Sequence, residues 1–539
     1  MKSKITLLCF TFIPSLLLAN SISGTPLGLD QRIDKAIQPF SDLDTGIVFF
    51  EVFSGAPFVI VLLVLSALFF TLYFRFPNIK YFTKAINVVR GKYDYLDKPS
   101  SGDEKLSISG DVKGTLSDES REGEVTHFQA LATAVSGTVG NGNIAGVALA
   151  IALGGPGATF WMIVCGLLGM STKFVECTLG VQFRDIGKDG TVYGGPMYYL
   201  SKGLKEKGFK VLSRITAILF AIFCIGGSFG GGNAAQSNQA TIVIKDLLGL
   251  ESTSAGAFIG IILAFLVGII IIGGIKRIAS VTEKIVPFMA VLYLLACVYI
   301  IVINFSLVDD ALSLIISQAF DPKSIGVGGI IGVLLVGFKR AAFSNEAGAG
   351  SASIAHSAVK TKYSASEGLV ALLEPFIDTV VICTMTALVI IIFNFTGAFE
   401  YGGSNGVVLI DGVSYEGAGI TSIAFAEYIP YSDVFLTVAV VLFAVSTMIS
   451  WSYYGLQSWK FLFGRGKAAD LTYKLLFLLF VIIGAAASMN SIWAFSDAMI
   501  FAMVFPNMIG LYFLFPVVKK QLNRYLAVSY THLTLPTKA

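Results

Sequence analysis

The chain has 539 residues, of which 55% are hydrophobic and only 14% are charged, and its formal net charge is +3. With a mean hydropathy of +0.76, this composition excludes an ordinary soluble domain, in which about 25% of residues are charged. The basic residues are spread over many loops rather than gathered with aromatics on one face, which argues against a nucleic-acid partner. The sequence therefore predicts an all-α polytopic membrane protein with membrane lipid as its solvent.

The sequence offers few residues for a metal site or for a catalytic nucleophile. The six cysteines stand singly in or beside apolar segments, and only three histidines occur. No C-x-x-C pair or histidine at ligand spacing is present, so neither a disulfide framework nor a metal site other than one for Na⁺ is predicted. Because a His-Glu-x-x-His motif and a nucleophile elbow are also missing from the sequence, we expect no enzyme and no cofactor.

The N-terminus has the pattern of a signal peptide. Lys2 and Lys4 precede an apolar run over 5–18, and small residues follow it. We expect a signal peptide over 1–20, with a short uncleaved anchor as the alternative. Either interpretation places residues 21–46 outside, as an amphipathic periplasmic segment on the membrane surface.

Apolar windows of about 20 residues, long enough to cross a bilayer, predict eleven spans. The first is an extra N-terminal transmembrane helix at 50–74, a cytoplasmic loop follows at 75–127, and a ten-helix core occupies 128–520. The core spans are expected near 128–153, 157–180, 213–243, 254–273, 285–304, 325–356, 367–393, 432–455, 472–488 and 491–517.

Loop charge orients these spans. The loops assigned to the inside hold most of the Lys and Arg residues, whereas the outer loop at 394–431 holds none. We therefore expect a bacterial inner (plasma) membrane protein with its N-terminus outside after signal removal and its C-terminus cytoplasmic. The loop at 394–431 is predicted to be periplasmic and to contain a short hairpin. Residues 527–539 are polar and patternless and predict an unstructured tail, either native or a scar of assembly.

The first core span is interrupted by the run GTVGNGNIAGVA. Glycine holds a helix poorly and asparagine competes for backbone hydrogen bonds, so this run favours unwinding. Non-helical backbone is tolerated at membrane depth only where protein or a watery cavity satisfies it. Glycines spaced for close helix packing are the alternative, and a dinucleotide fingerprint is excluded because no strand precedes the run.

A second interruption, FSNEAGAGSASIA, lies about two hundred residues later. The two runs share Asn-x-Ala-Gly, at 143–146 and 345–348. They fall in the first and sixth helices of the core, which run in opposite directions. This placement predicts an inverted repeat of five plus five helices with a solute site at its axis.

Free backbone groups at such a break suit a zwitterion and a cation together. The amides of 142–146 suit a carboxylate because they lie at the positive end of a half-helix. The carbonyls near 137–141 and 343–347 suit an ammonium group or Na⁺. Glu346 is either a direct participant or an ion-pair partner of Lys339 or Arg340.

Other polar residues stand inside apolar spans. Thr447 and Trp451 are four apart and share a helical face, so a hydroxyl and a ring are presented together. We expect Lys173 and Glu176 to form an ion pair. Glu374 and Asp378 are expected only to kink and hydrate their helix.

Five motifs in order, VGNGNIAGVALAIALGGPGATFWM, GGPMYYL, GGNAAQSNQ, FKRAAFSNEAGAGSASIAHSA and STMISWSYYG, resemble the alanine or glycine:cation symporter family. The likeness covers about residues 50–520. It implies a leucine-transporter-like (LeuT-like) fold with one extra N-terminal helix, Na⁺ as the coupling ion, and alanine or glycine as substrate.

The resemblance also implies the site residues. Those implied for the substrate are Gly140, Asn141, Gly142, Asn143, Gln236, Ser344, Asn345, Glu346, Gly348 and Trp451, and those implied for the cation are Gly137, Gly140, Ser446 and Thr447. Trp451 would limit the size of the substrate side chain. Asn141 departs from the threonine that is frequent in the family, which leaves the preferred small amino acid open.

The sequence therefore predicts a sodium-coupled symporter that imports small neutral amino acids by alternating access. Proton coupling is the close alternative and has Glu346 as its titrating candidate. A channel is less favoured because no ring of repeated pore residues is present.

Overall fold

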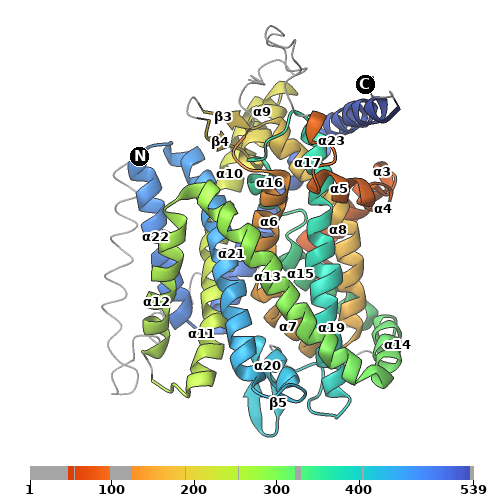
Figure 1. The fold of residues 1–539 in the computed structure, drawn as a ribbon, viewed down its shortest axis with the longest axis vertical. Helices are drawn as coiled ribbons and strands as arrows, with labels where there is room; N and C mark the ends of the chain where they lie inside the picture. The colour runs from red at the N-terminus through yellow and green to blue at the C-terminus, as the bar shows by residue number, and fades with distance from the viewer. Residues whose placement is uncertain are drawn as a thin grey trace, which may run out of the picture.

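The computed structural model describes residues 46–53, 55–96, 123–187, 190–252, 254–321, 329–403 and 406–534. The predicted signal peptide, and all but the last residue of the predicted amphipathic segment, lie outside these residues. Within them the chain is almost wholly helical, and the main helices run side by side along the long axis of the molecule (Figure 1).

The long helices follow the predicted spans closely. The first half of the core holds α6 (His127–Thr138), α7 (Ala145–Gly154), α8 (Gly157–Gln182), α10 (Lys210–Phe229), α11 (Ala235–Leu248), α12 (Ala255–Ile271) and α13 (Gly274–Ile303). The second half holds α15 (Gly329–Asn345), α16 (Ala352–His356), α17 (Ser364–Ala371), α18 (Leu373–Pro375), α19 (Thr384–Asn394), α21 (Ser432–Phe463), α22 (Lys467–Ala486) and α23 (Met489–Thr534).

Among the described residues, seven helices are long and apolar enough to cross a membrane, or eight if the bent pair α6 and α7 is one span. Two shorter apolar helices, α3 (Phe58–Tyr73) and α12, add to them. Reaching eleven also requires α15 with α16 to be one span, so the predicted count stays a prediction.

Each half of the core opens with a broken helix. α6 and α7 are bent by 56° around a single turn, η2 (Asn141–Asn143). In the second half, α15 ends at Asn345 and helix resumes only at Ala352 in α16. The two interruptions predicted from glycine and asparagine are confirmed, as is the all-α fold class.

Two π-helical turns interrupt other core helices. The turn η3 (Gly230–Ala234) joins α10 to α11, and η5 (Phe376–Cys383) joins α18 to α19. π-turns widen a helix locally and are frequent at functional sites. The turn η2 of the first broken helix packs against η5 and against α11, which follows η3.

The core is packed through small residues. α8 packs against α15 and α17, α10 against α21 and α23, and α12 against α22. A Cβ added at Gly337 of α15 would lie 2.5 Å from the Ala158 carbonyl oxygen and 2.8 Å from the Trp161 Cβ in α8. Only glycine permits this approach of α15 to α8.

We expect Gly337→Ala to lower the thermal midpoint of the protein in detergent by several degrees, because overpacking a tight contact costs roughly 1–3 kcal/mol. Size-exclusion chromatography after a temperature series measures the midpoint. The matched control is Gly419→Ala, where the nearest atom to the added Cβ is 3.5 Å away. Equal midpoints for the two variants would contradict this packing argument.

The two ends of the molecule differ (Figure 1). One end carries α9 (Pro196–Glu206) and the small pair β3 (Asp185–Ile186) and β4 (Val192–Tyr193). The other end carries α14 (Val308–Ala319), α20 (Ala418–Ala426) and the antiparallel pair β5 (Val408–Ile410) and β6 (Val413–Tyr415). The hairpin predicted within 394–431 is therefore confirmed.

The region before the core contains short elements. The strands β1 (Glu51–Phe53) and β2 (Ala56–Pro57) precede α3, and α4 (Pro77–Lys80), α5 (Phe82–Val89) and η1 (Asp94–Leu96) follow it. α3 packs against α8. Residues 97–122, half of the predicted cytoplasmic loop at 75–127, lie outside the described residues.

The predicted unstructured tail needs a correction. α23 continues as helix to Thr534, so residues 527–534 are helical. The reason is a long-range contact that the sequence pattern does not predict. Ser529 is buried, and its hydroxyl accepts a hydrogen bond of 2.5 Å from the Lys84 ammonium of α5. The end of α23 is thus packed against α5.

Candidate functional site

The break in the first core helix is built by Asn143 and two glycines. Gly140 has an extended backbone, and its amide donates to the Asn143 Oδ1 at 2.9 Å. The Asn143 amide in turn donates to the Gly140 carbonyl at 3.1 Å. Among the described residues, no hydrogen bond reaches the amides of Gly142, Ala145 and Gly146, as predicted for the start of a half-helix.

Gln236 of α11 lies against this break. Its Oε1 accepts from the Asn141 amide at 3.0 Å, and its Nε2 donates to the Gly231 carbonyl of η3 at 2.9 Å. The Asn141 Nδ2 donates to the Gln236 carbonyl at 3.2 Å. The Asn141 Oδ1 is buried and has no hydrogen-bond partner in the part of the chain that the structure describes. An acceptor is therefore left over at the break.

The second break depends on left-handed backbone. Glu346 has φ 54°, and Gly348 and Gly350 have φ 97° and 87°. A non-glycine residue at positive φ is strained and is held there by its surroundings. Ser344, the next-to-last residue of α15, lies just before this turn. It faces the first break, since a Cβ on Gly142 would lie 3.7 Å from the Ser344 Oγ.

Asp378 on η5 joins the two breaks. Its carboxylate accepts from the Asn143 Nδ2 at 2.6 Å, from the Ser344 Oγ at 2.9 Å and from the Thr379 Oγ1 at 2.7 Å. Asp378 is 0% exposed, and no ion pair to it occurs among the described residues. A buried carboxylate whose partners are all neutral is costly, and a bound cation would relieve that cost.

A second set of oxygens lies where α21 crosses the end of α6. The Thr447 Oγ1 is 3.0 Å from the Ser136 carbonyl oxygen and 3.5 Å from that of Val139. Gly140 packs directly on it, because a Cβ there would lie 2.4 Å from this hydroxyl. The Ser446 hydroxyl instead donates to the Phe443 carbonyl at 2.9 Å, so the structure does not bring Ser446 into the set.

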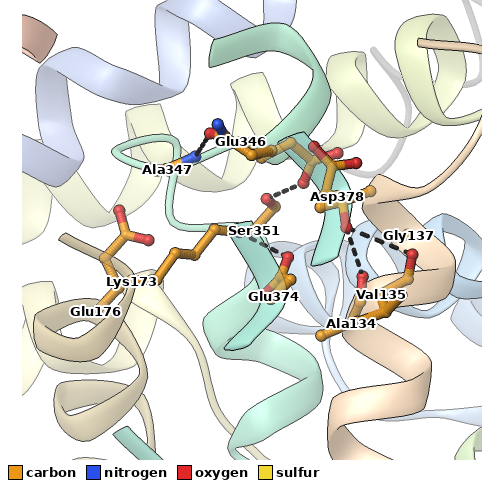
Figure 2. A network of polar contacts seen from close by, with 12 residues as sticks. Ala134, Val135, Gly137, Lys173, Glu176, Glu346, Ala347, Ser351, Glu374 and Asp378 are labelled. Carbon is orange, nitrogen blue, oxygen red and sulfur yellow. Dashed lines mark hydrogen bonds and ion pairs between the residues drawn. The ribbon is translucent and has the colours of Figure 1, made fainter. Parts of the chain in front are cut away.

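Trp451 of α21 packs beside the first break, between α6 and η3. Its Nε1 lies 3.0 Å from the Glu346 Oε1 and 3.2 Å from the Gly137 carbonyl oxygen. The Ser351 hydroxyl donates to the other oxygen of the Glu346 carboxylate, as Figure 2 shows. Gly232 permits this position, since a Cβ there would lie 2.1 Å from the indole Cγ. Gly137 and Glu346 are thus linked through one ring.

Gly348 lies away from the Asp378 group, whereas Asn345 reaches it, because the Asn345 Nδ2 donates to the Thr379 Oγ1 at 3.0 Å. The Asn345 Oδ1 accepts from the Ala347 amide at 3.0 Å, so this side chain shapes the turn. A Cβ on Gly348 would meet Leu63 of α3 at 2.2 Å. The structure therefore gathers Gly140, Asn141, Gly142, Asn143, Gln236, Ser344, Asn345 and Thr447 with Gly137, Glu346 and Trp451 beside them, and leaves Gly348 and Ser446 outside.

The hypothesis that Glu346 pairs with Lys339 or Arg340 is wrong. Both cations bind Asp497 of α23, at 3.0 Å and 2.6 Å. The left-handed turn at Glu346 directs its carboxylate to Trp451 instead. Beside the Asp497 ion pair, the Phe343 and Trp493 rings stack with centroids 5.1 Å apart.

The predicted pair of Lys173 with Glu176 is also wrong. Lys173 binds Glu374 of α18 at 2.9 Å, and Glu176 accepts from the Asn507 Nδ2 at 2.7 Å. Figure 2 shows the Lys173 side chain reaching toward Glu374. The spacing along one helix predicts Glu176 as the partner of Lys173, whereas the fold brings Glu374 from a facing helix to it.

The residue that sequence reasoning missed is Asp378. Its signal was present, because an aspartate in an apolar span is costly and usually has a partner or a task. Ser136 and Val139 act through backbone carbonyls, which no side-chain pattern identifies. Thr379 became visible only once η5 was placed beside α15.

Known proteins resemble this chain over most of its length. The sequence model of the sodium:alanine symporter family matches residues 42–537. The sodium/alanine symporter AgcS of Methanococcus maripaludis is 38% identical over 86% of this chain and 93% of its own. The sodium/proton-dependent alanine carrier protein of Bacillus sp. PS3 is 33% identical over 76% and 89%. The probable sodium/glutamine symporter GlnT of Bacillus subtilis is 31% identical over 87% of each chain.

Proposed function

Because the chain belongs to the sodium:alanine symporter family, we propose that it imports a small neutral amino acid, alanine or glycine, together with Na⁺ by alternating access. The observation that carries this proposal is the Asp378 carboxylate, buried between the two helix breaks with only neutral partners.

The substrate is proposed to bind at the first break. Its carboxylate would take hydrogen bonds from the amides of Gly142, Ala145 and Gly146, at the positive end of α7. Its ammonium group would donate to the Asn141 Oδ1, which has no partner among the described residues. Trp451 and Phe343 would bound the space for the side chain, which favours alanine and glycine over larger amino acids.

Two oxygen sets are proposed for Na⁺. One is Thr447 with the Ser136 and Val139 carbonyls, and the other is Asp378 with Ser344 and Thr379. Both consist of oxygen atoms, which hard cations prefer. Each Na⁺ that enters through 100 mV supplies about 2.3 kcal/mol, or about fiftyfold in accumulation.

We place the protein in a bacterial inner membrane with the α9 end toward the cytoplasm. The positive-inside pattern supports this orientation, since the loop at 394–431, at the opposite end, has no Lys or Arg. Alternating access would then rock the two halves around the breaks, exposing the site first at the β5–β6 end and then at the α9 end.

Uptake into proteoliposomes tests the proposal. Labelled alanine is expected to accumulate under an inward Na⁺ gradient, and excess unlabelled glycine is expected to compete while glutamine does not. Sealed vesicles in K⁺ without Na⁺ are the control. Absence of any response to Na⁺ would refute sodium coupling.

Proton coupling is the second candidate, and the same vesicles separate it. An inward proton gradient without Na⁺ is expected to drive no accumulation of alanine. If it drives uptake as well as Na⁺ does, the coupling ion is the proton and the Asp378 set binds it. Competition by glutamine but not by glycine would shift the substrate class instead.

A further inference from the structure

The α9 end of the core holds a buried run of ionisable side chains that the proposed transport site does not use. It consists of Lys173 of α8, Glu374 of α18, His356 of α16, Glu367 of α17 and His127 of α6. His127 is 7% exposed and the other four are 0% exposed. Ionisable groups buried inside a membrane protein are costly and usually have a task.

Acid and base alternate along this run. The Lys173 ammonium is 2.9 Å from Glu374 Oε1, and Glu374 Oε2 is 3.7 Å from His356 Nε2. The His356 Nδ1 is 2.5 Å from Glu367 Oε1. The other oxygen of Glu367 contacts His127 Nδ1. One carboxylate is thus held between two imidazoles.

The two imidazoles belong to the two broken helices. His127 is the first residue of α6, and His356 is the last residue of α16. Glu367 therefore ties together the half-helices that lie at the α9 end, both visible in the upper part of Figure 1.

Backbone contacts reinforce this junction between the start of α6 and the end of α16. Val125 and Val359 form a parallel bridge, the Glu124 amide donates to the Ala358 carbonyl at 2.8 Å, and the Lys360 amide donates to the Val125 carbonyl at 2.8 Å. These bonds do not titrate between pH 6 and 8. Any dependence of the junction on pH in that range must come from the side chains.

The charges of the buried run balance only if the two imidazoles together bind one proton. Glu367 and Glu374 carry two negative charges, and Lys173 carries one positive charge. A dry interior penalises an uncompensated charge by several kcal/mol, and one proton on the pair of imidazoles removes it. The other titratable or charged groups that face the run are Glu176, Cys177 and Arg184 from α8 and its end, Tyr199 from α9, Glu346, Asp378 of η5 and Tyr454.

We propose that the two imidazoles held by the Glu367 carboxylate, His127 and His356, are a proton-binding site, and that separation of α6 from α16 at the α9 end releases the proton. As the junction opens, water solvates the carboxylate, and the imidazolium N–H proton passes to a water molecule. The junction is therefore held more tightly at pH 6, where the imidazolium persists, than at pH 8. This site is separate from the amino-acid site and does not depend on which substrate is carried.

Hydrogen–deuterium exchange of the purified full-length protein tests the site without substrate or Na⁺. After correction for intrinsic exchange, the amides of residues 127–138 are expected to exchange about tenfold faster at pH 8 than at pH 6. In His356→Gln and Glu367→Gln the corrected rates are expected to be equal at the two pH values. The matched control is His532→Gln, which removes the third histidine of the sequence and is expected to follow the wild type.

Corrected exchange in the wild type that does not change with pH would overturn the proposal. A wild-type pH profile in His356→Gln and Glu367→Gln would overturn it as well. If those two variants fail to give a monodisperse peak, His127→Gln at the edge of the run decides by the same comparison. Since no transport is measured, failure of sodium-coupled alanine uptake would not alter this result.

Discussion

Replacing Asp378 with asparagine is expected to weaken the activation of transport by Na⁺ severely while the protein still folds. The substitution keeps the size of the side chain and deletes a buried negative charge whose partners, Asn143, Ser344 and Thr379, are all neutral. Without the charge, Na⁺ loses its main attraction in a site that excludes water. We expect the Na⁺ concentration for half-maximal alanine uptake to rise at least about a hundredfold, or roughly 2.7 kcal/mol.

Initial rates of labelled alanine uptake over a series of Na⁺ concentrations at constant ionic strength measure this effect. The matched control is Asp470→Asn, because Asp470 is a partly exposed carboxylate whose partners are Lys460 and Lys474. It is expected to leave the Na⁺ dependence unchanged. If Asp378→Asn also leaves it unchanged, the Thr447 set binds the coupling ion without help from Asp378.

The two breaks could be predicted from the sequence because they are local. Gly140, Asn141 and Asn143 weaken helix wherever they occur, and Gly348 and Gly350 adopt a positive φ that other residues avoid. The repeat of Asn-x-Ala-Gly then gave the relation between the halves. Helix ends were predicted less well, and α23 passes the expected end because Ser529 finds a partner in Lys84.

The site could be predicted only in part, because its chemistry is assembled across helices. The resemblance named Gln236 as a site residue, and the structure shows its Oε1 accepting from the Asn141 amide. Asp378 was missed because nothing in its own helix shows that Asn143 and Ser344 face it. Ser446 and Thr447 are adjacent and chemically alike, and only the rotation of α21 decides which of them meets the break.

Charge pairing was the weakest part of the sequence analysis. Lys173 and Glu176 are neighbours on one helical face, yet Lys173 binds Glu374 across to α18. A buried ammonium group needs a carboxylate at close range, and the fold rather than the spacing determines which one is there. The same reasoning applies to the junction at Glu367, where three helices bring two histidines to one carboxylate.

Adding one methyl group at Gly140 is expected to abolish Na⁺-driven uptake. A Cβ at this position would lie 2.4 Å from the Thr447 Oγ1 and 3.0 Å from the Gln236 Oε1, so it would separate α21 from the first break. Thr447 would then be displaced from the Ser136 and Val139 carbonyls. We expect Gly140→Ala to reduce the initial rate of alanine uptake at least about a hundredfold, equivalent to roughly 2.7 kcal/mol.

The matched control for Gly140→Ala is Gly146→Ala, three residues past the turn η2. The nearest atom to a Cβ there is the Trp493 Cη2 at 3.8 Å, an ordinary contact. Alanine also favours helix over glycine by about 1 kcal/mol, so α7 should be slightly stabilised. Alanine keeps the backbone amide that is proposed for the substrate carboxylate, so we expect Gly146→Ala to transport within about twofold of the wild type, or about 0.4 kcal/mol. An equal loss of uptake rate in both variants would mean that any added bulk in the span blocks transport. A loss of uptake rate in Gly140→Ala alone places the coupling between Na⁺ and substrate where α21 meets the broken helix.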